Sequence, residues 1–284
     1  MYVFQLDLSR AFDRVKHSSI LAALKLQSAS LQCLALLSMM LHMSSMAYRL
    51  GTVESGMHNM ERGLPQGAPE SPLLFVLVTE LVLRPLLLKW RTAGRAWCID
   101  SFWLASICFA DDILLVSTSL PDLESMAAEV TEAFLKVGLE VGPVKCHWSS
   151  FPSKSGLSFR LGNAALPWEQ TITFVGTVID LAGGDAAALD HRIAQATKVW
   201  GKWRNVLYCR HVAPIRRARL IYNSVFSSVL WLSECWNPTQ AMLRRLDSWG
   251  ARTLALAYGL RKSVAEDALG FWRRLHWFGH YLYY

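Results

Sequence analysis

Two apolar runs meet at a pair of adjacent acids in residues 107–116, Ile-Cys-Phe-Ala-Asp-Asp-Ile-Leu-Leu-Val. Such runs are typical of strands, and the step Ala110-Asp111-Asp112 between them predicts a tight hairpin. Adjacent carboxylates repel each other, and burying an unpaired carboxylate costs several kcal/mol or shifts its pKa strongly. A divalent cation such as Mg²⁺ removes that cost, because it prefers oxygen ligands. Asp111 and Asp112 are therefore candidate metal ligands, with a solvated hairpin tip as the alternative.

A third acid, Asp7, follows a β-rich segment at the start of the chain. Residues 2–8 read Tyr-Val-Phe-Gln-Leu-Asp-Leu and predict a strand that ends near Asp7. Alone, such an acid more often ends a strand or caps a helix. If its strand neighbours the 107–116 hairpin in one sheet, the three acids converge as a two-metal phosphoryl-transfer site requires. We then expect their carboxylates within about 4–6 Å of one another.

The remaining pattern divides the chain near residue 180 into a mixed first part and a helical second part. In the first part we expect helices over 18–27, 30–47, 73–91 and 121–137, a hairpin over 48–60, and short strands near 146–150, 157–161 and 171–179. Five Gly and Pro residues keep 63–72 out of helix and strand. In the second part, helices are expected to start near Asp185, Pro214, Pro238 and Val264.

Composition and charge indicate an ordered protein that meets a polyanion. The 284 residues are 52% hydrophobic and 18% charged, which excludes a disordered tail and a disulfide-stapled mini-protein. Residues 1–150 carry 12 Lys and Arg against 14 Asp and Glu, net −2, whereas residues 151–284 carry 17 against 8, net +9. The basic second half predicts contact with a polyanion, and solvated surface charge is the alternative.

Several other classes of protein are disfavoured by the sequence. The six cysteines show no CxxC pairing, so reduced thiols are expected rather than a zinc site or a disulfide framework. Residues 26–48 are uncharged, but polar residues interrupt them, so we expect a buried helix and no membrane span. Basic residues within the first twenty positions argue against a secretory signal. We therefore expect an intracellular protein, nuclear or cytoplasmic, that does not act at a membrane.

Five segments, in order, resemble the motifs of reverse transcriptases of the non-LTR retrotransposon type. They are 6–15 (LDLSRAFDRV), 63–75 (GLPQGAPESPLLF), 109–112 (FADD), 138–146 (GLEVGPVKC) and 174–177 (FVGT). A weaker similarity, over 271–280 (FWRRLHWFGH), is to a segment that follows the polymerase. The resemblance implies an α+β fold: a right-hand polymerase palm over 1–180, with an antiparallel sheet packed on helices, then a basic all-α, thumb-like and post-polymerase region over 181–284.

The resemblance also implies a reaction, namely RNA-directed DNA synthesis by two-metal nucleotidyl transfer. The cofactor is then Mg²⁺, as two ions, or Mn²⁺, and the partners are an RNA template, a DNA primer and deoxynucleoside triphosphates. Asp7 and Asp111 would ligate both ions with Asp112 beside them. Lys145 would act as a general acid toward pyrophosphate or as a cation facing phosphate, and an exposed structural lysine is the alternative.

Three further residues take substrate-binding roles from the resemblance. Phe12 looks like the ring that blocks a ribose 2′-hydroxyl, and an ordinary core aromatic is the alternative. Gln66 and Gly67 would lie against the templating base pair, where a residue without a side chain lets the backbone approach closely. A simple Gly- and Pro-rich turn is the alternative for both.

Basic residues in the second part are expected to contact the nucleic-acid backbone, while the tryptophans among them are expected mainly in the core. The candidates are Lys198, Lys202, Arg204, Arg216, Arg217 and Arg219. The chain departs from the family pattern because no finger region, with its triphosphate-binding cations, precedes the first motif. We therefore expect a truncated copy with little activity alone. A non-catalytic nucleic-acid-binding remnant is the alternative.

Overall fold

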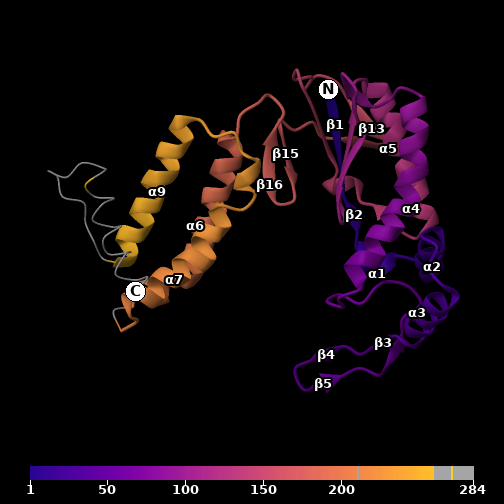
Figure 1. Cartoon of the computed structure of the whole chain (residues 1–284), viewed down its shortest axis with the longest axis horizontal. Helices are drawn as coiled ribbons and strands as arrows, with labels where there is room; N and C mark the ends of the chain where they lie inside the picture. The colour runs from indigo at the N-terminus through magenta and orange to yellow at the C-terminus, as the bar shows by residue number, and fades with distance from the viewer. Residues whose placement is uncertain (210, 259–269, 271–284) are drawn as a thin grey trace. The chain divides into compact units, whose positions relative to one another are not determined.

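The computed structural model describes residues 1–209, 211–258 and 270 (Figure 1). The expected helix near Val264 and the segment 271–280 therefore lie outside the described residues. The chain forms two compact units, Met1–Val175 and Gly176–Tyr284.

A four-stranded antiparallel sheet in the order β12-β1-β10-β9 forms the centre of the first unit. Its strands are β1 (Tyr2–Leu6), β9 (Ser106–Phe109), β10 (Asp112–Ser117) and β12 (His147–Ser150). Leu6 pairs with Ile113, so the residue after β1 and the first residue of β10 meet at the same edge of the sheet. The strand before Asp7 therefore neighbours the 107–116 hairpin, which was the condition for the acids to converge, and antiparallel pairing brings Asp7 toward Asp112.

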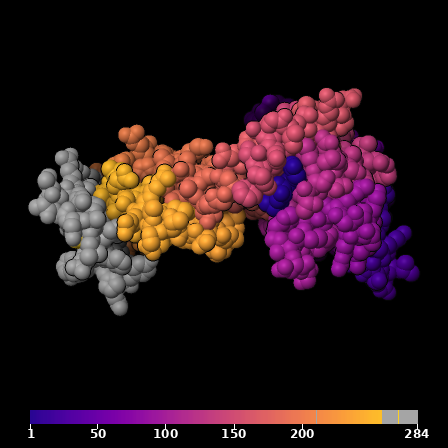
Figure 2. All heavy atoms as spheres, turned by 90° about the horizontal axis from the view of Figure 1, so that it is seen from above, coloured from indigo at the N-terminus to yellow at the C-terminus, as the bar shows by residue number. Residues whose placement is uncertain are grey.

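Two long helices pack beside this sheet and close the core. They are α4 (Ser71–Thr92) and α5 (Leu120–Lys136), which Figure 1 shows side by side. Phe75 and Trp90 of α4 and Phe134 of α5 are fully buried together with Phe4 of β1. On the face shown in Figure 2, the first residues of the chain are visible as a small patch between later segments. The core forms because β1 and β10 are apolar on both faces while α5 is apolar along one stripe.

Three shorter helices and a β-ribbon follow β1 in the chain. The helices are α1 (Ala11–Arg14), α2 (His17–Leu26) and α3 (Leu31–Met43), so the helix expected over 30–47 ends four residues early. The ribbon consists of β3 (Ser45–Met46) paired with β6 (His58–Asn59) and β4 (Arg49–Leu50) paired with β5 (Val53–Glu54). Figure 1 shows it as an arm that extends from α3. The expected hairpin is thus present, and it begins at Ser45 rather than at Tyr48.

The remaining elements of the first unit are short. They are β2 (Leu8–Ser9) paired with β11 (Glu140–Val141), β7 (Trp97–Ile99) with β8 (Phe102–Leu104), β13 (Phe159–Leu161) with β14 (Ala164–Leu166), a 3₁₀ turn Pro143–Lys145, and β15 (Thr171–Phe174) beside β12. The β7–β8 hairpin was not expected from the sequence, which predicted a strand pair only around Asp111 and Asp112 in this part of the chain.

The second unit is mainly helical and has its own core. Its elements are β16 (Thr177–Asp180), α6 (Ala186–Leu207), α7 (Pro214–Leu220), a π-helical turn Ile221–Phe226, α8 (Ser227–Val229), a 3₁₀ turn Ser233–Cys235 and α9 (Gln240–Tyr258). Trp200 and Trp249 pack against the buried residues of this core, as expected, whereas Trp203 is 41% exposed. An antiparallel sheet packed on helices, followed by a helical unit, confirms the predicted α+β class.

One helix of the described residues, α4, is long and apolar enough to cross a membrane by length and composition. Buried helices of protein cores meet the same criterion, and eight residues of α4 are buried inside the first unit. The uncharged stretch that the sequence singled out, residues 26–48, contains α3, which is shorter than a span requires. The prediction of a buried helix there is wrong, because only Leu34 and Leu41 of α3 are buried, while Leu31 and Met43 are 83% and 74% exposed.

Candidate active site

Asp112 begins β10 at the sheet edge, directly after the tip of the β9–β10 hairpin. Its carboxylate Oδ2 accepts a hydrogen bond from the backbone N–H of Val175 at 3.2 Å. Burial raises the pKa of the Asp112 carboxyl, that hydrogen bond opposes the rise, and the charges of Asp111 and Asp7 add to it. The charges of Asp7 and Asp111 therefore both act on Asp112, which lies with Asp7 at one edge of the sheet.

Asp7 lies between β1 and β2, and its side chain is 34% exposed. Its Oδ2 atom is nevertheless buried and has no hydrogen-bond partner. The nearest cation is Nζ of Lys145, at 3.7 Å, which is an ion pair but too long for a hydrogen bond. The backbone of Gly142 packs closely here, because a Cβ added to it would lie 2.6 Å from Oγ of Ser9 and 3.5 Å from Oδ2 of Asp7. The site thus contains one buried carboxylate oxygen without a hydrogen-bond donor.

Asp111 occupies the two-residue loop of the hairpin and is exposed. The residue before it, Ala110, has a left-handed backbone with φ of 53°, an unfavourable conformation for a residue with a Cβ. Among the described residues, no group of three or more His, Cys, Asp or Glu side chains is arranged to hold a metal ion. The structure therefore brings Asp7 and Asp112 to one edge without forming a closed set of metal ligands with Asp111.

The donor set still fits a hard divalent cation by its chemistry. The Asp7 oxygen that lacks a hydrogen bond and the raised pKa of Asp112 are both costs that a nearby divalent cation removes. Lys145 is the cation now nearest to Asp7, and its side chain is 75% exposed. Such an exposed ion pair is weak, so it would yield readily to a divalent ion.

The three residues with expected substrate-binding roles lie in α1 and in the loop before α4. Phe12 is half-buried and stacks on the buried ring of Phe75, with ring centroids 4.9 Å apart. Gln66 is exposed, and its Nε2 donates a hydrogen bond to Oδ1 of Asp13 at 3.0 Å. Gly67 is exposed with φ of +92°, and a Cβ there would meet nothing within 4 Å. The core contact expected as the alternative for Phe12 is therefore present.

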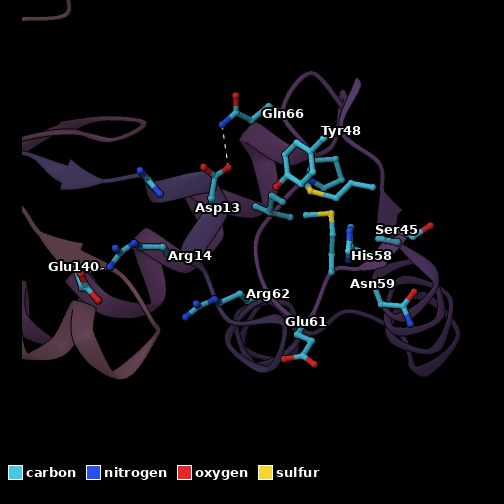
Figure 3. Close-up of a pocket in the computed structure, with 16 residues that line it drawn as sticks. Asp13, Arg14, Ser45, Tyr48, His58, Asn59, Glu61, Arg62, Gln66 and Glu140 are labelled. Atoms are coloured by element: carbon cyan, nitrogen blue, oxygen red, sulfur yellow. Dashed lines mark hydrogen bonds and ion pairs between the residues drawn. The ribbon is translucent and has the colours of Figure 1, made fainter. Parts of the chain in front are cut away.

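A large groove of about 1110 Å³ lies between α1, the β-ribbon and residues 60–66 (Figure 3). Figure 3 shows Asp13 and Gln66 pointing toward each other on its wall, with Arg14 beside Glu140, its ion-pair partner. Tyr48 also lines the groove. Tyr48 could not be predicted from the sequence, because an isolated aromatic in a hairpin gives no signal until strand pairing fixes which face it occupies.

The candidate nucleic-acid contacts of the second unit fall into two groups. Five of them are exposed: Lys198, Lys202 and Arg204 on α6, and Arg216 and Arg219 on α7. Arg217 differs, because its Nη1 donates hydrogen bonds to the carbonyl oxygens of Leu207 at 3.3 Å and Ala257 at 2.6 Å. It therefore satisfies carbonyls near the ends of α6 and α9, a structural task that the sequence did not suggest.

Comparison with known proteins agrees with the motif order. Residues 1–179 match the family model described as reverse transcriptase (RNA-dependent DNA polymerase). The chain is 29% identical over 147 residues to a retrovirus-related Pol polyprotein from the type-1 retrotransposable element R2 of Nasonia vitripennis, covering 52% of this chain and 14% of that protein. It is 25% identical over 251 residues to the transposon TX1 uncharacterized 149 kDa protein of Xenopus laevis, covering 85% and 18%.

Solved structures are more distant in sequence. One of them, an apo telomerase from Candida tropicalis, aligns with 90% of this chain and 47% of its own at 10% identity and a TM-score of 0.47. The chain spans less than a fifth of the length of the two curated relatives described above.

Proposed function

The chain belongs to the reverse transcriptase family, with relatives among non-LTR retrotransposon proteins, and from that premise we propose that it performs two-metal nucleotidyl transfer. The observation that carries the proposal is the meeting of Asp7 and Asp112 at one sheet edge, where a buried oxygen of Asp7 lacks a hydrogen bond. Substrates would be deoxynucleoside triphosphates, added to a DNA primer on an RNA template. These substrates are intracellular, so the nucleus or cytoplasm is the expected compartment.

Asp7 and Asp112 would hold the ions, with Asp111 turning in from its exposed loop. Two Mg²⁺ ions, or Mn²⁺ in their place, supply activation of the primer 3′-hydroxyl and neutralisation of the leaving pyrophosphate when bound. Lys145 would leave Asp7 and carry its charge, or a proton from Nζ, to the pyrophosphate oxygens. Its exposed side chain has the freedom that this step requires.

The substrate would be shaped by the segment after Asp7 and by the loop before α4. Phe12, held by its stacking on Phe75, would limit the room for a ribose 2′-hydroxyl. Gln66 and Gly67 would lie against the templating base pair, and open space around Gly67 leaves its backbone accessible. The exposed cations of α6 and α7 would contact phosphates of the primer–template duplex, whereas Arg217 would hold their scaffold together.

The decisive test of the metal site is thermal unfolding of the full chain with and without millimolar MnCl₂. A ligand that binds only the folded state raises the melting temperature, so we expect a rise for the wild type. Asp7→Asn and Asp112→Asn should reduce that rise. Asp100→Asn, which changes an exposed acid in the β7–β8 turn, is the matched control and should leave it intact. A melting curve that Mn²⁺ does not move would contradict a metal site formed by these acids.

Primer extension tests the reaction itself. We propose that the chain extends a primer slowly, because Asp111 lies in an exposed loop and must turn in before it can hold the ions together with Asp7 and Asp112. Asp111→Asn should abolish the incorporation that is observed. Duplex binding without any Mn²⁺ response would favour the second candidate, a non-catalytic binding protein.

A further inference from the structure

We propose that Asp13 is a positioning residue for Gln66, and that it sets the orientation in which the Gln66 amide meets the base pair in the groove. The proposal rests on the substrate-binding role proposed above for Gln66. The new element is the role of the Asp13 carboxylate in holding the Gln66 amide, a role that the motif resemblance does not include. Asp13 acts through Gln66 in this account and does not itself contact the reacting atoms.

The contact joins two elements that are far apart in the chain. Asp13 belongs to α1, Gln66 to the loop before α4, and Oδ1 of Asp13 accepts from Nε2 of Gln66 at 3.0 Å. Figure 3 shows the two side chains pointing toward each other on the groove wall. Among the described residues, Asp13 forms no ion pair, and the cation next to it in the chain, Arg14, pairs with Glu140. The Asp13 carboxylate is therefore available to the amide.

The chemistry of the two groups makes this contact directional. A glutamine amide has two N–H donors on one side and a carbonyl acceptor on the other. In solvent the amide rotates freely, so either side can face a given partner. An ionised carboxylate only accepts hydrogen bonds, so it holds the NH₂ side and excludes the flipped amide. The carbonyl oxygen and the second N–H of Gln66 are then left for other partners in one arrangement. Asp13 thereby defines which hydrogen bonds Gln66 can offer to a nucleotide.

The backbone of the Gln66 loop is held by other contacts. The N–H of Gly63 donates to the carbonyl of Val15 and that of Leu64 to the carbonyl of Phe12, both at 2.7 Å. Nε2 of His17 lies 3.0 Å from the Gly63 carbonyl oxygen. Removing the Asp13 side chain therefore leaves the loop in place and releases only the amide. A loss of fold and a loss of positioning can thus be told apart.

The test measures selection of the complementary nucleotide without chemistry. The full chain is titrated with an RNA template annealed to a dideoxy-terminated DNA primer, in millimolar Mg²⁺, with the complementary or a mismatched deoxynucleoside triphosphate. We expect Asp13→Ala to reduce the preference for the complementary nucleotide by about 3- to 10-fold, the effect of one charge-assisted hydrogen bond at an exposed site. Asp13→Asn should retain part of the preference, because its carbonyl still accepts.

The matched control is Glu61→Gln, which removes one negative charge from the same groove. Glu61 is exposed, and its side chain makes no hydrogen bond or ion pair with another described residue. Its substitution should leave the preference unchanged. In a Gln66→Ala background, Asp13→Ala should have no further effect, because the two residues act as a unit. An equal loss in that background would overturn the proposal.

A second measurement separates this proposal from the proposed function. If the wild type shows no preference for the complementary nucleotide, the substrate-binding role of the site fails in this chain. The positioning contact is then decided by the NMR signals of the Gln66 side-chain amide. They should shift in Asp13→Ala and remain in place in Glu61→Gln. Signals that stay unchanged in both variants would overturn the positioning role as well.

Discussion

Asp112, at the sheet edge, lowers the stability of the metal-free protein while providing a carboxylate that a cation can bind. Burial and two neighbouring acids raise its pKa above the ordinary value of 3.8. The folded state therefore binds this proton more tightly than the unfolded state does. By linkage, stability falls as the pH rises from the ordinary range through the raised folded-state pKa. Ionised Asp112 is thus a cost to the metal-free protein, and it is the form that a cation needs.

Asp112→Asn should therefore stabilise the metal-free chain at neutral pH. The gain should be below about 1 kcal/mol, because solvent screens this partly exposed carboxyl. It should grow as the pH rises from about 4 and vanish below that, where both side chains are neutral. Urea unfolding in EDTA at several pH values measures it, with exposed Asp111→Asn as the comparison. A variant less stable than the wild type at pH 8 would show that the Val175 hydrogen bond outweighs the charge effect.

At the scale of elements, the junction between α1 and the loop before α4 fixes the groove wall. Gly63 has φ of +91°, and a Cβ there would lie 2.8 Å from the carbonyl oxygen of Asp13. The loop therefore approaches α1 as closely as a backbone without a side chain allows. This approach places Gln66 within reach of Asp13, so one glycine makes the side-chain contact possible.

Gly63→Ala should destabilise the chain by more than about 2 kcal/mol. The left-handed backbone alone costs an alanine roughly 1–2 kcal/mol, and the contact with Asp13 adds to it. Gly67→Ala is the matched control, because its φ is +92° while its Cβ would meet nothing within 4 Å. Only the backbone cost should appear there. Urea unfolding of the two variants gives the comparison, and equal losses would show that the close approach is not tight in solution.

At the scale of the molecule, the two units differ in charge and in the candidate site that each contains. The first unit holds the acids and the groove, and the second presents exposed cations around a core of its own. Residues 192–284 carry 15 Lys and Arg against 4 Asp and Glu, net +11. Cations that neutralise phosphates release counterions, so binding to a duplex should weaken steeply with salt.

Arg216→Glu with Arg219→Glu should weaken primer–template binding to the same degree for every sequence. The slope of log affinity against log salt should become shallower by about two units, since each phosphate contact contributes about 0.9. Arg84→Glu with Lys136→Glu changes the net charge equally on exposed helix positions of the first unit and serves as control. Fluorescence anisotropy across salt concentrations provides the data. Affinity independent of salt would show that the basic residues serve solubility only.

Patterns of short range were predictable from the sequence. Alternation and apolar runs predicted β1, β10 and α5, because backbone periodicity is a local property. The Gly and Pro residues in 63–72 likewise predicted the loop before α4. Motif order gave the family. The end of α3 and the β7–β8 hairpin were missed, since strand pairing depends on partners that a local pattern does not contain.

The amino-acid sequence by itself determined which acids occur at the ends of apolar strands, and hence which side chains are expensive to leave unpaired. Only the tertiary structure decided how each is compensated. Asp112 accepts a hydrogen bond from the Val175 N–H, whereas Asp7 has only an ion pair with Lys145. Arg217 donates hydrogen bonds to backbone carbonyls and is not directed to solvent, where a phosphate would bind. The Asp13–Gln66 contact likewise spans 53 positions. Side-chain partners of this kind are set by packing between elements, and no local pattern encodes them.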